Sequence, residues 1–136
     1  MVSELWRPAD DRAAAHLVDA VLPWAPVRQW VLTVPYRLRY QMAWNHGLSR
    51  TVLGVHARVL LDVYARGAQR RGIEGGQTGM VTALQRAGSG LNVNLHFHTL
   101  VLDGVFVEAP EGAPAFQPAP APSDDMNRYL SGHLRY

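Results

Sequence analysis

The stretch Leu91-Asn-Val-Asn-Leu-His-Phe-His-Thr-Leu-Val-Leu102 decides the fold expected for this chain. Side chains along a β-strand point alternately to its two faces, so residues of even and odd number separate. The even-numbered row is polar and consists of Asn92, Asn94, His96 and His98. The odd-numbered row is apolar and consists of Leu91, Val93, Leu95 and Phe97. The stretch therefore predicts a strand with one face in an apolar core and a polar row on the other.

The His-X-His pair in the polar row has the spacing of a two-ligand metal site. Alternate residues on a strand are about 6.6 Å apart along its axis, and imidazole nitrogens bind a metal at about 2.1 Å. His96 and His98 can therefore converge on one ion. Two histidines that are merely hydrogen-bonded or solvated would show the same spacing. The polar row as a whole favours the metal, because burying four polar side chains without a ligand or water costs free energy.

A third ligand has to come from a neighbouring segment. Gln85 lies on the preceding strand candidate, across the turn at residues 87–90, and is our first choice. Asp103 and Glu108 are the alternatives, and Gln85 can equally be a plain cross-strand residue.

Three further segments have strand character. Residues 29–35 form a compact β-branched and aromatic run with apolar side chains at both parities, typical of a central strand covered on both faces. Residues 80–86 predict a strand before the polar row. The dipeptide Asp103-Gly104 predicts a two-residue type I′ hairpin into a strand over residues 105–107. Three antiparallel strands are therefore expected to follow one another as a meander.

Two helices are expected beside these strands. From residue 38 to 71 the apolar period becomes that of a helix, with a break near His46-Gly47. A shorter helix is expected over residues 13–22, capped by Asp10 or Asp11. The sequence thus predicts an α+β fold: an antiparallel β-sheet with His-X-His on a central strand and helices packed on it.

The length of 136 residues, 48% of them apolar, fits one domain with a single core. No cysteine is present, so a disulfide framework and a thiolate zinc site are both excluded. The sequence has neither a signal-peptide pattern nor about 18 consecutive apolar residues, so we expect no membrane partner and a cytoplasmic location. The expected parts are an N-terminal segment with a short helix (1–27), a core (28–108), a Pro/Ala-rich linker (109–123) and a C-terminal tail (124–136).

The basic residues gather in the middle of the chain, and all 13 of them are arginine. Residues 28–86 hold nine arginines and only two acidic residues. Arginine presents a planar fork of donors that matches phosphate, so this part is compatible with a nucleic-acid partner. A solvated surface that is rich in arginine is the alternative explanation.

Several separated segments resemble the catalytic domain of rolling-circle insertion-sequence transposases of the HUH, two-tyrosine class. They are Arg28-Gln-Trp-Val-Leu-Thr-Val-Pro-Tyr-Arg-Leu-Arg39, Gly79-Met-Val-Thr-Ala-Leu-Gln-Arg-Ala-Gly-Ser-Gly-Leu-Asn-Val-Asn-Leu-His-Phe-His98 and Leu102-Asp-Gly-Val-Phe106. In the HUH motif U is a bulky apolar residue, here Phe97. The resemblance covers about residues 13–107 in order, and the agreement of separated motifs makes it specific.

The resemblance implies a nuclease and strand transferase that acts on single-stranded DNA, with an HUH endonuclease-like fold that is incomplete here. Carried over by position, His96 and His98 hold a divalent ion, Mg²⁺ or Mn²⁺, that polarises the scissile phosphate. A tyrosine attacks this phosphate and becomes joined to the 5′ end. Gln85, Asn92 and Asn94 belong to the matching motif.

The chain departs from this class at both ends. Members of the class begin with a cysteine-rich zinc module, and this chain has no cysteine. Their nucleophilic tyrosines lie four apart on a helix well downstream of His-X-His, where this sequence offers only Tyr129 and Tyr136, seven apart. Tyr36 and Tyr40 have the right spacing but precede the metal strand, and we expect them to be packing or DNA-backbone residues.

We therefore expect a fragment of an HUH transposase, with its equipment for DNA transposition incomplete and its enzyme activity an open question. The alternative is a non-catalytic remnant that binds single-stranded DNA, with stacking on Trp30 or Trp44. An unrelated His-X-His metalloenzyme for a small molecule is the third hypothesis. The expected partner is single-stranded or hairpin DNA, in a bacterial cytoplasm and associated with the nucleoid. Its expected contacts are Arg37, Arg39, Arg70, Arg71, Arg86, Asn92 and Asn94.

Overall fold

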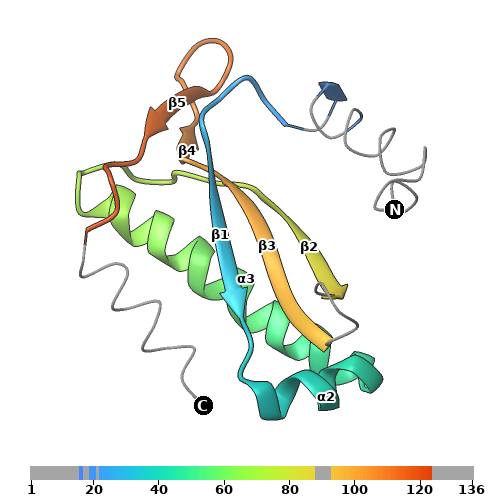
Figure 1. Cartoon of the computed structure of the whole chain (residues 1–136). Helices are drawn as coiled ribbons and strands as arrows, with labels where there is room; N and C mark the ends of the chain where they lie inside the picture. The colour runs from blue at the N-terminus through green and yellow to red at the C-terminus, as the bar shows by residue number, and fades with distance from the viewer. Residues whose placement is uncertain (1–15, 17–18, 21, 88–92, 124–136) are drawn as a thin grey trace.

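The computed structural model describes residues 16, 19–20, 22–87 and 93–123. The elements are β1 (Val27–Thr33), α2 (Tyr36–Trp44), α3 (His46–Gln69), β2 (Met80–Ala87), β3 (Val93–Leu102), β4 (Gly104–Val107) and β5 (Ala115–Pro118). Figure 1 shows a twisted sheet of β1, β3 and β2 with α3 lying along one of its faces and α2 at one end. The predicted α+β class, with an antiparallel sheet and helices, is confirmed.

Strand β3 is the middle strand of the three-stranded sheet, whose order is β1-β3-β2. It pairs antiparallel with both neighbours, and the register places Thr33 and Gln85 on either side of His96. Directly opposite residues of antiparallel strands point to the same face. The expected position of His-X-His on a central strand is therefore confirmed.

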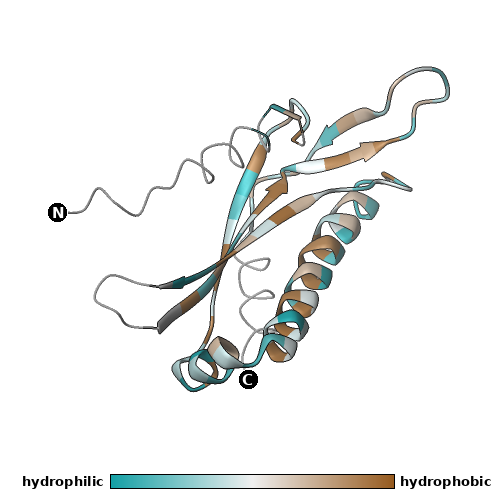
Figure 2. Ribbon diagram, turned by 90° about the vertical axis from the view of Figure 1, so that its right-hand side faces the viewer, coloured by the Kyte–Doolittle hydropathy of each residue, from teal (hydrophilic) through white to brown (hydrophobic). Residues whose placement is uncertain are grey.

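The core lies between this sheet and α3 (Figure 2). From β3, the side chains of Leu95, Phe97, Thr99 and Val101 point into it and are at most 1% exposed. From the helix, Leu60, Val63 and Tyr64 pack against Val101. The described part of the predicted apolar row, Leu95 and Phe97, is therefore buried, because the amphipathic helix covers that side of the strand.

The two helices come from one helical period interrupted at a single residue. Asn45 has an extended backbone, with φ −107° and ψ 93°, and its side chain accepts a hydrogen bond of 3.0 Å from the backbone N–H of Leu48. This is the N-cap arrangement that asparagine favours, because it satisfies one of the unpaired N–H groups at a helix start. The break expected near His46-Gly47 is confirmed, one residue earlier.

The prediction that residues 29–35 form a central strand covered on both faces is wrong. Strand β1 is at the edge of the sheet, and Val27 and Val31 are 44% and 53% exposed. Only the face that carries Trp30 and Leu32 packs against the core. Apolar residues at both parities did not indicate two covered faces here, because β-branched side chains are also favoured on the half-exposed strands of an antiparallel sheet.

The predicted type I′ hairpin at Asp103-Gly104 is also wrong. That turn needs positive φ at both central residues, and Gly104 does not have it. The Asp103 backbone instead donates to Pro26 O and accepts from Ala119 N, at 2.7 Å each. The chain consequently runs on into β4, which pairs with β5 and not with β3, so the expected three-stranded meander is not formed.

The Pro/Ala-rich segment 109–123 is not only a linker, because it contains β5. The ring centroids of Phe116 and Phe106 lie 5.1 Å apart across the β4-β5 pair. A side chain at Gly104 would meet Phe116 and the backbone of Gln117, so glycine permits the close approach of the two strands. The expected helix over residues 13–22 lies largely outside the described residues, as does the whole tail 124–136.

Candidate metal and nucleic-acid site

The face of the sheet opposite α3 is called the open face here, because no described element covers it (Figure 2). Cross-strand pairing sets its composition, three positions from each strand. The open face consists of Gln29, Val31, Thr33, Val81, Ala83, Gln85, His96, His98 and Leu100. Its only ionisable side chains are the two histidines.

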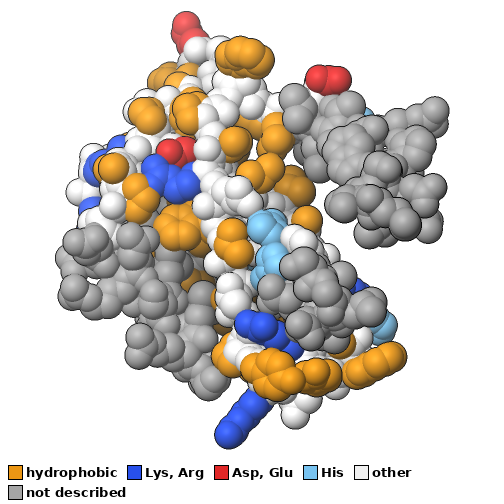
Figure 3. Space-filling view, in the orientation of Figure 1, with side chains coloured by type: hydrophobic (Ala, Val, Ile, Leu, Met, Phe, Trp, Pro, Cys, Tyr) orange, Lys and Arg blue, Asp and Glu red, His pale blue; other side chains and the backbone are white. Residues whose placement is uncertain are grey.

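The predicted ligand pair lies at the centre of the open face. The rings of His96 and His98 have centroids 4.7 Å apart and an interplanar angle of 65°. Figure 3 shows histidine side chains at the surface over β3, and both residues are partly exposed. Two nitrogens that bind one ion at about 2.1 Å each lie within about 4.2 Å of one another. The ring spacing is therefore compatible with a shared ion.

Gln85 is next to this pair, as expected for the third ligand. Its Oε1 lies 3.1 Å from Nε2 of His96, directly across from it in the β2-β3 register. Asp103, one of the alternatives, is seven residues further along the chain from His96, roughly 20 Å in a strand. It is engaged there by Arg28, with contacts of 2.9 and 2.6 Å. Glu108 is exposed and follows β4, away from the three-stranded sheet.

Gln29 is a further member of the site, and the sequence alone did not predict it. Its Nε2 lies 2.8 Å from Nδ1 of His98. The other ring nitrogen of His98, Nε2, is buried and has no hydrogen-bond partner among the described residues. Gln29 could have been found from the parity of β1 once its antiparallel pairing with β3 was known, because it shares a face with His98.

This environment fits a metal ligand. A metal-bound histidine generally donates its other ring N–H to a nearby acceptor, which fixes the tautomer. The amide nitrogen of Gln29 faces Nδ1 of His98, so Nδ1 accepts and Nε2 of His98 carries the proton. A 180° turn of this amide would present its oxygen to Nδ1 and make Nε2 of His98 the lone-pair nitrogen that a metal needs. An unpartnered buried nitrogen costs free energy, which a bound cation would recover.

The donor set of His96, His98 and Gln85 is neutral, with two nitrogens and one amide oxygen. Within the described ranges, no three His, Cys, Asp or Glu residues are grouped so that they could hold a metal ion. Among the described residues of the open face there is no carboxylate to offset the ion's double positive charge. An anionic substrate such as a phosphodiester would supply the missing negative charge.

The structure divides the five expected DNA-binding arginines into two groups. Arg37 is exposed on α2, Arg39 donates to Val34 O at 2.6 Å, and Arg86 lies 3.4 Å from Nδ1 of His46. These three are at the end of the sheet where α2 lies. Arg70 and Arg71 follow α3 at the opposite end.

The second group belongs to a different feature, a pocket of about 270 Å³. Arg70 and Arg71 line it together with the Arg28-Asp103 ion pair and Tyr64. Hydrogen bonding to Asp103 raises the pKa of Arg28, and burial raises the pKa of Tyr64. The pocket lies on the α3 side of the sheet, so Arg70 and Arg71 do not join His96 and His98.

Four predicted positions fall beyond what the structure describes. Asn92, Tyr129 and Tyr136 lie outside the described residues, and so does the side chain of Asn94. Of the tyrosines that are described, Tyr64 lies on the α3 side of the sheet, and Tyr36 and Tyr40 share a hydrogen bond on α2.

In comparisons with family models, with curated proteins and with solved structures, nothing matches this chain significantly. Within the part of the chain that the structure describes, no helix is long and apolar enough to cross a membrane.

Proposed function

We propose that this chain binds single-stranded DNA at the open face, through a divalent ion held by His96, His98 and Gln85. The juxtaposition of these three side chains, two from β3 and one from β2, on the open face of the sheet is the observation that carries the proposal. We further propose, from the sequence resemblance, that this face is the metal-and-DNA part of an HUH transposase.

The residues divide the work of holding the ion and the strand. His96 and His98 are the nitrogen ligands, Gln85 adds an oxygen, and Gln29 fixes the orientation of the His98 ring. A divalent ion here would polarise a phosphodiester and balance its charge. Because the protein ligands are neutral, ion and phosphate should bind more tightly together than either does alone.

A non-catalytic role in binding single-stranded DNA is the second candidate. Among the described tyrosines, Tyr64 lies on the α3 side of the sheet, away from the histidines. The hydroxyls of Tyr36 and Tyr40 are hydrogen-bonded to each other. In-line attack on phosphorus requires a rigidly held nucleophile at about 3 to 3.5 Å. Incubation with labelled single-stranded DNA and Mn²⁺, followed by denaturing electrophoresis, separates the two candidates. We expect no covalent band from this chain alone, and a band abolished by Tyr129→Phe or Tyr136→Phe would make it a nuclease.

The metal site is tested by calorimetric titration with Mn²⁺, with and without a short oligonucleotide. One site is expected, lost in His96→Ala and in His98→Ala and weakened in Gln85→Ala. His46→Ala is the matched control, because His46 is an exposed histidine at the start of α3. Binding of Mn²⁺ by the double variant His96→Ala/His98→Ala as tightly as by the native chain would refute the site.

DNA binding is tested by the salt dependence of affinity for a single strand. Each phosphate contact contributes a logarithmic slope of about −0.7. Arg37→Gln and Arg86→Gln should each make the slope shallower by about that amount, since each removes one contact. Arg58→Gln, an exposed position on α3, should leave it unchanged. A slope near zero for the native chain would instead assign the arginines to a solvated surface.

A further inference from the structure

Three aromatic side chains form a row on the outer side of α2. Tyr36, Tyr40 and Trp44 are spaced four residues apart and are 65%, 48% and 86% exposed. Residues four apart lie on the same side of a helix, so the three rings follow one stripe. The opposite side of the helix carries Leu38 and Met42, which pack into the core. The row is therefore not the part of α2 that holds the fold together.

The two tyrosines fix each other in place. The Tyr36 hydroxyl donates to the Tyr40 hydroxyl at 3.2 Å, and their rings meet edge-on with centroids 5.3 Å apart. This hydrogen bond raises the pKa of Tyr36. Trp44, at the C-terminal end of the row, is the most exposed ring of the three and offers a broad planar surface.

The surroundings of the row are basic. Residues 20–61 contain no Asp or Glu, and Arg37 and Arg39 stand within the row's own helix. Figure 3 shows hydrophobic side chains gathered over α2, with basic side chains beside them and the histidines on the same side of the molecule. Helix α2 also follows β1 closely, and the last residue of β1, Thr33, pairs with His96. The row thus lies at the same end of the sheet as His96.

We propose that the row of Tyr36, Tyr40 and Trp44 is a stacking surface for the unpaired bases of a single strand. This rests on the proposed function, because the open face would bind the phosphates of the same strand. Base stacking on aromatic side chains tolerates any sequence, since every base has a planar face. Arginines interleaved with the rings suit the phosphates between successive bases.

The chemistry of the row argues against two other occupants. A helix that lies in a membrane interface needs a continuous apolar face of aliphatic and aromatic side chains. Here Leu38 and Met42 point into the core, so α2 leaves outside only a narrow row of rings, two of which carry hydroxyl groups. A second copy of the chain would bring Arg37 and Arg39 against their own counterparts, and like charges repel. A single nucleic-acid strand is a polyanion with flat apolar bases, so it complements both the rings and the arginines.

The test measures fluorescence anisotropy of a labelled oligothymidylate and of an abasic strand of equal length. Trp44→Ala should weaken binding of the oligothymidylate roughly 5- to 150-fold, the effect of losing one stacked base. It should leave binding of the abasic strand and the salt slope unchanged, since no phosphate contact is lost. Trp44→Phe, which retains a ring, should restore most of the affinity.

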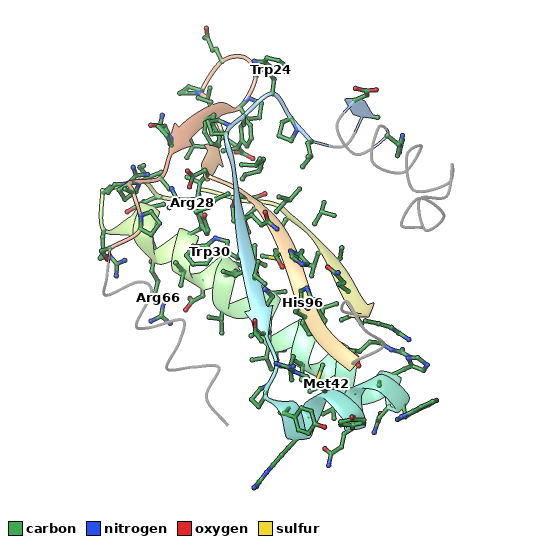
Figure 4. All side chains as sticks on the ribbon, in the orientation of Figure 1. Trp24, Arg28, Trp30, Met42, Arg66 and His96 are labelled. Carbon is green, nitrogen blue, oxygen red and sulfur yellow. The ribbon has the colours of Figure 1, made fainter. Side chains whose placement is uncertain are left out.

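Trp24→Ala is the matched control, because Trp24 is fully exposed at the other end of the sheet (Figure 4). It should change neither affinity. Equal affinities of the native chain for the two strands, with no effect of Trp44→Ala, would overturn the stacking surface while leaving phosphate binding intact. Failure to bind either strand would overturn the proposed function as well. A Trp44-dependent association with anionic vesicles, or a Trp44-dependent dimer, without loss of oligothymidylate affinity in Trp44→Ala, would assign the row to that other partner.

Discussion

The two faces of the central strand place histidines in opposite environments. On the covered face, His56 of α3 is 3% exposed, and its Nε2 lies 3.0 Å from Thr99 Oγ1. Thr99 is in turn 2.9 Å from the hydroxyl of Thr82, so the buried polar groups form a connected chain. On the open face, His96 and His98 meet amide side chains, and Nε2 of His98 has no partner within the described ranges.

A structural histidine and a candidate ligand differ here in how the polar atoms of the ring are satisfied. Both kinds lie near β3, but within the described ranges only His98, on the open face, has a buried side-chain nitrogen without a partner in the protein. Buried polar groups are normally hydrogen-bonded, and an exception calls for a ligand or a water. The covered face therefore supplies stability, and the open face carries the proposed binding site.

The largest effect is expected when two neighbouring residues on opposite faces of β3 are each changed to alanine. Phe97, 1% exposed in the core, should cost about 3 to 5 kcal/mol in the free energy of unfolding when changed to alanine, because a cavity remains. His98→Ala, one residue further on, should leave stability within about 0.5 kcal/mol in the absence of metal. Urea denaturation of both variants checks this. Equal losses would mean that both faces are packed in solution.

A pH-dependent effect of intermediate size is expected on the covered face. Burial lowers the pKa of His56 below its usual 6.5, so the folded state resists protonation while the unfolded chain accepts it. The stability contributed by neutral His56 is complete above pH 6.5 and is lost as the pH falls from there toward the folded-state pKa.

The measurement is the urea midpoint of the native chain and of His56→Gln at pH 7.5 and 5.5, compared as a double difference. Glutamine does not titrate and retains a side-chain donor for Thr99. The native chain should lose more stability on acidification than His56→Gln does. A parallel decline of the two midpoints would show that His56 is not the group that titrates.

The sequence was most informative where alternation and burial coincide. The apolar row with Leu95 and Phe97 specified the inner face of β3, and the helical period specified α3 together with its break. Gln85 could be placed beside His96 because the two strands are consecutive and few residues separate them in the sequence. Local pattern was sufficient in each of these cases.

Partners distant in sequence could not be predicted in the same way. That β1 lies at the edge, and that β4 pairs with β5, depends on which strands reach each other in three dimensions. Gln29 joins His98 across 69 residues, through a pairing that its own sequence does not reveal. The expected DNA-binding arginines likewise lie at two ends of the molecule, because α3 separates Arg70 and Arg71 from the others. A count of charges along the chain does not show this separation.

The smallest effects are expected for two ion pairs, one beside the covered face and one on the solvent side of α3. Asp103 holds Arg28 at 2.6 Å with both side chains only about one-fifth exposed, whereas Asp62 pairs with Arg66 on the solvent side of α3, where both are at least 40% exposed. Water screens the second pair, and such pairs on a helix contribute about 0.3 to 0.5 kcal/mol. Asp103→Asn should cost more, about 1.5 to 3 kcal/mol, since it weakens a charge-assisted pair of hydrogen bonds that water does not fully replace.

Urea denaturation with and without added salt distinguishes the two ion pairs. Salt should erase the cost of Asp62→Asn and leave most of the cost of Asp103→Asn. If salt erased both costs alike, the ion pair of Arg28 would belong to the solvated surface and not to the margin of the covered face.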